Sequence, residues 1–149
     1  MDNLQEYKIR EILSNFRKRT NILYSNLFTE DGFVVTIDQA YKVEDEDFHR
    51  AISAICSSIM VLAETGVELV KENCTIKEIS IQAGNQLDPE GFTIILESIN
   101  KDIKLSIMFT TFLNLGLILF ELNQTIEKLK KNFSIFQKKK TREGVKSTN

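Results

Sequence analysis

Apolar residues recur along this chain with two different periods, one typical of helices and one typical of strands. Near the start they recur every three or four positions, which predicts a helix over 4–19. Two runs rich in β-branched and aromatic residues follow, at 22–29 and 33–37. Gly32 ends the polar link between them and accepts the positive φ of a tight turn, so the pair predicts a β-hairpin. The predicted inner face of the helix is Ile9, Ile12, Leu13 and Phe16.

A second, longer helix is predicted over 44–70. Four acidic residues at 44–47 suit the positive end of a helix dipole and mark its start. Gly66 lies inside the pattern and costs about 1 kcal/mol relative to alanine, so a bend is expected there. The spacing predicts a core face of Phe48, Ile52, Ile55, Ile59, Leu62 and Ala63, continuing to Leu69 and Val70. The solvent face is predicted to be Arg50, Ser53, Ser57, Glu64 and Glu68.

Three strands and a helix are predicted in the second half. The strands cover 75–83, 92–99 and 103–109, and a loop with the only proline, 84–91, separates the first two. The apolar block after Asn114 then changes to a helical period, which predicts a final helix over 115–136. Its apolar positions are Leu115, Ile118, Leu122, Ile126, Leu129, Phe133 and Phe136.

The predicted order is therefore α-β-β-α-β-β-β-α. Short links between most strands favour an antiparallel sheet with helices on its faces, which is the α+β class. We expect one domain over 1–136, followed by a basic, polar and disordered tail over 137–149.

Composition narrows the class of protein. A net charge of −2 over 149 residues gives no nucleic-acid footprint. The acidic start lacks the pattern of a signal peptide, and no uncharged apolar run reaches the roughly 18 residues of a membrane span. Two cysteines, Cys56 and Cys74, do not define a disulfide framework. These features predict a cytoplasmic protein.

Candidate catalytic chemistry is sparse. The single histidine, His49, lies at the start of the long helix without an evident orienting partner, so we interpret it as a surface residue. Cys56 is interpreted as a small buried hydrophobe. The sequence has no metal-ligand spacing and no glycine-rich phosphate loop, and the acids at 44–47 point in different directions. We therefore expect neither cofactor nor metal, and not an enzyme.

Two features stand out against this background. A stripe of small, uncharged residues lies beside the predicted core face of the long helix: Ala54, Ser58, Val61 and Thr65. It either widens the core face or lets another helix approach closely. The C-terminal end is basic, and it either caps the last helix or contacts an acidic partner or an anionic membrane. The candidate contacts there are Lys138, Lys139, Lys140 and Arg142.

Three segments together resemble the Roadblock/dynein light-chain family. Residues 29–35, Thr-Glu-Asp-Gly-Phe-Val-Val, are similar to its "DGFVV" hairpin. Residues 51–54, Ala-Ile-Ser-Ala, resemble part of its central helix, and residues 114–117, Asn-Leu-Gly-Leu, resemble the junction into its last helix. The predicted element order also matches over about 4–133.

This resemblance implies a five-stranded antiparallel sheet, with the central helix on one face and the two terminal helices on the other. It implies dimers that pair edge strands and pack central helices, no catalytic residues, and a role as platform or regulator of small Ras-like GTPases. Some bacterial members stimulate GTP hydrolysis, whereas others are adaptors such as dynein light chains or lysosomal scaffold subunits. The loop at 84–91, longer than usual, and the basic tail depart from the pattern.

The leading hypothesis is a dimer, with itself or a Roadblock-like paralogue, that binds a small GTPase. Its predicted interface residues are Arg50, Ala54, Ser57, Ser58, Val61, Glu64 and Thr65. The alternative is a structural adaptor without effect on nucleotide turnover. A small-molecule sensor ranks last, because the predicted core faces carry almost no polar residue. Membrane contact is expected only through the basic tail.

Overall fold

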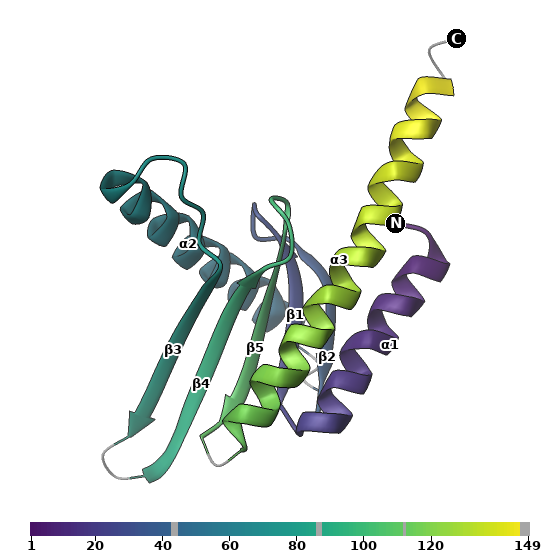
Figure 1. Ribbon diagram of the computed structural model, residues 1–149. Helices are drawn as coiled ribbons and strands as arrows, with labels where there is room; N and C mark the ends of the chain where they lie inside the picture. The colour runs from purple at the N-terminus through teal and green to yellow at the C-terminus, as the bar shows by residue number, and fades with distance from the viewer. Residues whose placement is uncertain (43–44, 86–87, 112, 147–149) are drawn as a thin grey trace.

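The computed structural model describes residues 1–42, 45–85, 88–111 and 113–146, and side chains for all of these except 85, 88, 89 and 135–146. Its elements follow the predicted order and the predicted α+β class (Figure 1). They are α1 (Asn3–Thr20), β1 (Tyr24–Thr29), β2 (Val34–Gln39), α2 (Glu46–Val70), β3 (Glu78–Asn85), β4 (Asp88–Ser98), β5 (Ile103–Thr110) and α3 (Leu115–Lys146).

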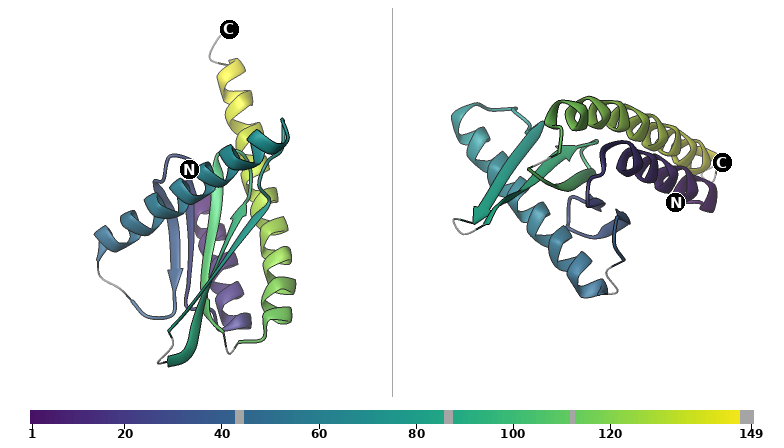
Figure 2. Two further views of the ribbon diagram at one scale, coloured as in Figure 1. Left: turned by 90° about the vertical axis from the view of Figure 1, so that its left-hand side faces the viewer. Right: turned by 90° about the horizontal axis from the view of Figure 1, so that it is seen from below.

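The five strands form one antiparallel sheet in the order β2-β1-β5-β4-β3. α2 covers one face of it, and α1 and α3 lie together on the other (Figure 2). α1 and α3 run antiparallel, because Gln5 Nε2 donates to the Asn132 carbonyl while Arg19 pairs with Glu121 at the other end. This layering is the one that the family resemblance implies.

Local signals set the helix ends. The Asp2 carboxylate accepts from the Gln5 amide at 2.7 Å and caps α1, which ends at Asn21 in the left-handed region with φ 59°. Asp45 caps α2 in the same way through the Asp47 amide. At the start of α3, the Asn114 side chain accepts a hydrogen bond from the Leu117 amide. The apolar block therefore changes from strand to helix at a capping residue.

The core is divided between the two faces of the sheet, and its two parts differ in size. The α1/α3 side is the larger, and its buried residues are Ile9, Leu13, Phe16, Ile22, Leu27, Ile95, Ile99, Leu105, Ile107, Phe109, Ile118, Leu122, Ile126, Leu129 and Phe133. On the α2 side the fully buried set is Phe28, Cys56, Met60 and Leu96. α2 is therefore held by a small apolar cluster, supplemented by polar contacts.

The two edge strands differ. β2 has six residues, its pairing with β1 is irregular between Leu27 and Phe28, and the Asp38 carboxylate accepts a 2.6 Å ion-pair hydrogen bond from Arg17 of α1. β3 has eight residues and pairs with β4 on one side only among the described strands. The backbone groups on its other side are therefore open to a further strand.

Two predicted boundaries are wrong. The loop predicted over 84–91 belongs mostly to the strands, since β3 reaches Asn85 and β4 begins at Asp88 with Asn85 opposite it. An irregularity between Ala83 and Asn85 accommodates the extra residues near Pro89, as a β-bulge does. α3 continues ten residues past the predicted end, to Lys146, because Lys, Arg, Gln and Glu are good helix formers. The domain end at 136 stays a prediction.

Candidate functional site

Among the described elements, α2 carries the most exposed large hydrophobic residues. In the described part of the chain, α2 is the helix that is long and apolar enough, by length and composition alone, to cross a membrane, although no such run was predicted. Only 22% of its most apolar window is buried. A helix in the core of a soluble domain is mostly buried, so α2 presents an apolar face without a partner inside this chain.

The predicted core face of α2 is partly wrong. Ile55 is 55% exposed and Leu62 is 72% exposed, and Phe48 is also exposed. The residues that face the sheet are Ser53, Cys56, Ser57 and Met60. The helix is rotated relative to the prediction: the predicted solvent residues Ser53 and Ser57 are buried, whereas the predicted core residues Ile52 and Ile59 still pack against the small apolar cluster on the α2 side. The predicted continuation of the core face is also wrong, because Leu69 and Val70 are exposed.

The rotation has a polar cause. Asn26 on β1, an interior strand of the sheet, is fully buried, and its amide donates to Ser53 Oγ at 2.7 Å. The Ser57 hydroxyl donates to the Glu30 carbonyl in the β1–β2 turn. Buried polar groups need such partners, and isoleucine or leucine at these positions would leave them unpaired.

The predicted small-residue stripe lies on the outer face. Ala54, Ser58, Val61 and Thr65 are all exposed. The Ser58 hydroxyl donates to the Ala54 carbonyl at 2.8 Å, and the Thr65 hydroxyl donates to the Val61 carbonyl at 2.9 Å. Because both hydroxyls are paired within the helix, the stripe presents a smooth surface with little demand for water. Together with Ile55 and Leu62 it forms what we call the α2 outer face.

The other predicted interface residues are scattered. Arg50 is exposed and pairs with Glu46 and Asp47 of its own helix. Glu64 is half-buried. Ser57 is buried on the side of α2 that faces the sheet, so the prediction that Ser57 lies on the solvent face is wrong. The side chains of Lys138, Lys139, Lys140 and Arg142 lie outside the described residues, and their contact stays a prediction.

Ile55 and Leu62 are the interface candidates that the sequence prediction missed. Their signal was visible, since the apolar and small positions 51, 54/55, 58, 61/62 and 65 repeat every three or four residues. Such a repeat typically follows the contact line between two helices.

The titratable side chains between α2 and the sheet are buried or half-buried. His49 stacks on Tyr24, and its Nδ1 lies 3.0 Å from the Tyr24 hydroxyl, so it is half-buried rather than free on the surface. Burial raises the pKa of the Tyr24 hydroxyl, and burial likewise raises the pKa of the Cys56 thiol, which keeps both protonated. Among the described residues, no group of three or more His, Cys, Asp or Glu is placed to hold a metal ion.

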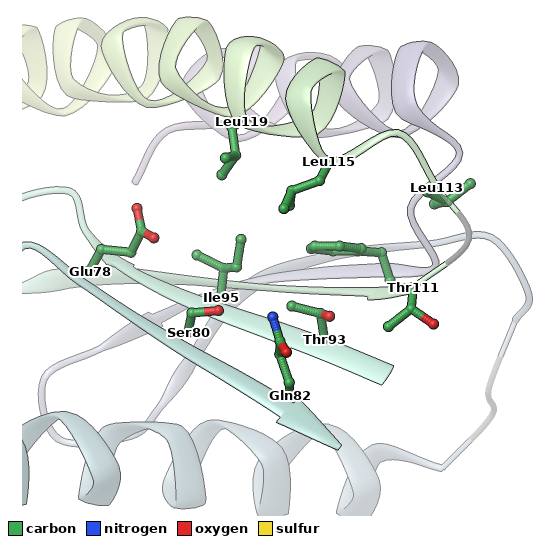
Figure 3. Close-up of a pocket in the computed structure, with 10 residues that line it drawn as sticks. Glu78, Ser80, Gln82, Thr93, Ile95, Thr111, Leu113, Leu115 and Leu119 are labelled. Atoms are coloured by element: carbon green, nitrogen blue, oxygen red, sulfur yellow. The ribbon is translucent and has the colours of Figure 1, made fainter. Parts of the chain in front are cut away.

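The opposite face of the sheet carries a groove between β3, β4, β5 and the start of α3 (Figure 3). We call it the β3–α3 groove. Its volume is about 280 Å³. The lining residues are Glu78, Ser80, Gln82, Thr93, Ile95, Phe109, Thr111, Leu113, Leu115 and Leu119.

A pair of carboxyl groups lies at one end of this groove. Glu97 is directly opposite Glu78 in the β3–β4 register and is only 4% exposed. Burial, followed by the neighbouring Glu78 carboxyl, raises the pKa of Glu97 to about 8, although Lys77 and Lys130 act against the shift. Glu97 is therefore largely protonated at neutral pH.

This pair predicts a pH-dependent stability. Because the folded-state pKa of Glu97 exceeds its unfolded value, the folded chain retains the proton longer. The contribution of Glu97 to the free energy of unfolding should be greatest at about pH 4.5 and below, and it should be lost as pH rises through about 8. Urea unfolding of Glu97→Gln should show a much smaller loss between about pH 5.5 and 8.5, a difference of a few kcal/mol at most. Glu11→Gln, on exposed α1 surface, should keep the wild-type slope.

Comparison with known proteins identifies the fold. No family model matches the sequence, and no curated protein matches it significantly. Among solved structures, MglB of Myxococcus xanthus superposes with a TM-score of 0.76 at 15% identity, over 90% of this chain and 93% of that one. The gliding protein MglB of Thermus thermophilus gives 0.75 at 14% identity, over 89% and 93%.

A Roadblock/LC7 domain from Streptomyces avermitilis gives a TM-score of 0.69 at 10% identity, over 84% of this chain and 97% of that one. These likenesses cover 84% to 90% of this chain. The protein therefore has the Roadblock/LC7 fold, which it shares with MglB.

Proposed function

We propose that this protein is a non-enzymatic, cytoplasmic binding module that dimerises through the α2 outer face and the open edge of β3, and that the dimer binds a small Ras-like GTPase. The observation that carries the proposal is the exposed apolar surface of α2. Ile55 and Leu62 project from a helix that is attached to its own sheet on the other side. Burying such a surface against a second copy or a paralogue is favourable through the hydrophobic effect.

The small residues favour a helix as the partner. Ala54 and Ser58 are one turn apart, and neither has a side chain long enough to separate two packed helices. The self-paired hydroxyls of Ser58 and Thr65 can enter an interface without losing hydrogen bonds. A solved MglB structure has a tetrameric arrangement, which supports self-association for a protein of this fold.

The GTPase part of the proposal rests on the family resemblance. The test is to purify the chain, mix it with the small GTPases of its own genome, and follow both complex formation and GTP hydrolysis. A complex with faster hydrolysis supports a regulator. Binding without any change in hydrolysis supports the structural adaptor instead. If no small GTPase binds at micromolar concentrations, the GTPase proposal is wrong.

The dimer is tested by charge placed at the centre of the α2 outer face. Ala54→Glu or Ser58→Arg should weaken self-association by about 100-fold or more, because a charge buried without a partner at an interface costs several kcal/mol. The molar mass should fall to that of one chain in light scattering coupled to size exclusion. Asn15→Arg, on exposed α1 surface, is the matched control and should keep the dimer mass. An unchanged mass for Ser58→Arg would exclude this face as the interface.

A further inference from the structure

The β3–α3 groove lies on the side of the sheet opposite α2. Ile79 of β3 packs toward the α2 cluster, whereas Glu78, Ser80 and Gln82 of the same strand line the groove. In Figure 1, β3 lies clear of both terminal helices. The groove therefore lies on the other face of the sheet from the α2 outer face, and its β3 wall is the strand whose edge is proposed to join the dimer.

The groove is apolar along its floor and along α3. Ile95 points up from the sheet, and Leu115 and Leu119 point down from α3 toward it (Figure 3). Phe109 of β5 also lines the groove. The space left between them, about 280 Å³, is just below the range of pockets for whole small-molecule ligands. It suits one or two inserted side chains of an aliphatic kind.

One end of the groove is acidic. The Glu78 side chain points into it, and Glu97 lies beside Glu78 on the same face of the sheet. Two adjacent carboxyl groups resist ionising together, and a cation bound to the exposed Glu78 carboxylate reduces this repulsion. An ammonium or guanidinium group also donates several charge-assisted hydrogen bonds to carboxylates. The nearest cations of the chain that act on Glu97 are Lys77 and Lys130, and neither forms a described salt bridge with it.

The third wall, β3, offers hydrogen-bonding groups to a peptide backbone. The hydroxyl of Ser80 and the amide of Gln82 alternate along the strand on the groove side, next to the acidic end. An aliphatic floor, an acidic end and a polar wall together match a peptide segment more closely than a free ion or a lipid chain, because each part meets a different portion of such a segment.

We infer that the β3–α3 groove is a docking site for a segment of a partner protein that inserts aliphatic side chains between α3 and the sheet and places a Lys or Arg side chain on the exposed carboxyl group of Glu78. This adds a second partner surface, on the face away from the α2 outer face. A chain with both surfaces can connect two partners at once.

The test uses the full chain and a fluorescent peptide in which Leu and Lys alternate, followed by fluorescence anisotropy. The comparison peptide carries Glu in place of each Lys and should bind at least about tenfold more weakly. Glu78→Gln should weaken the Lys peptide about five- to tenfold. Glu11→Gln removes the same charge from exposed α1 surface and should have no effect.

Two leucines of α3 provide a matched pair for the apolar part. Leu115 lines the groove and is 48% exposed, whereas Leu117 is 42% exposed and does not line it. Because both are surface residues, aspartate at either position should leave the fold intact, as circular dichroism would confirm. Leu115→Asp should abolish binding of the Lys peptide, and Leu117→Asp, with the same added charge, should not.

Three results would overturn the inference. One is no binding of the Lys peptide at about 1 mM. Another is equal effects of Leu115→Asp and Leu117→Asp. The third is that hexylammonium alone binds as tightly as the peptide, which would make the groove a site for a free amine. None of these outcomes requires a GTPase, so the failure of this inference is distinguishable from the failure of the proposed GTPase contact.

Discussion

Replacing Phe28 with alanine should lower the free energy of unfolding by about 3–5 kcal/mol and should release α2 before the rest of the fold. Phe28 is fully buried, and it is the largest residue of the small cluster that fastens α2 to the sheet. The α1/α3 side has its own, larger set of buried residues and does not include Phe28. Loss of this one ring therefore removes a large part of the apolar attachment on one face only.

Urea unfolding followed by circular dichroism measures the loss of stability, and hydrogen exchange measures its distribution. Amides of α2 should exchange faster than those of α1 and α3 in the Phe28→Ala protein. Phe33→Ala is the matched control, since Phe33 is 70% exposed in the same hairpin and its removal should change stability by no more than about 0.5 kcal/mol. Uniform acceleration in all three helices would show that α2 is not a separately attached layer.

Replacing Gly32 with alanine should cost about 1–3 kcal/mol. Gly32 has φ +87°, a conformation that side chains with a Cβ rarely adopt. An added Cβ would also lie 3.1 Å from Ala54 Cα in α2, which is backbone and cannot swing away. The hairpin would have to move off α2, and the hydrogen bond from Ser57 to the Glu30 carbonyl would be strained with it.

Replacing Gly66 with alanine should have the opposite effect on stability from replacing Gly32. Gly66 lies inside α2, and nothing is within 4 Å of the place where its Cβ would be. Alanine there should raise stability by about 0.5–1 kcal/mol, because it loses less conformational freedom on folding. Urea midpoints of the two variants should therefore shift in opposite directions. A neutral Gly32→Ala would contradict the close approach of the turn to α2.

The order and type of all eight elements could be predicted because each has a clear local period. The face of α2 that meets the sheet could not be predicted from that period. This helix has apolar or small residues around most of its circumference, and its orientation is decided by Asn26 and by the Glu30 carbonyl, each 27 positions from the serine that pairs with it. Such distant polar pairings leave no trace in a hydrophobic pattern.

Two further features could not be predicted from the hydrophobic pattern, for other reasons. The end of α3 is polar, and a search for apolar periodicity stops at Phe136 although the backbone stays helical to Lys146. The β3–α3 groove depends on residues from three strands and a helix that meet only in the fold, such as Glu78 and Leu119. The small-residue stripe was found because its members share a single helix.

The difference between the two edge strands limits how many copies can join. β2 is short, irregularly paired and fixed to α1 through Arg17 and Asp38, which are features that discourage a further strand. Among the described strands, β3 is the edge strand that is longer, with an irregularity only near its end, between Ala83 and Asn85. A unit with one usable edge can extend the sheet once, after which both β3 edges are occupied. Association by this route closes at two chains and cannot propagate into a fibre.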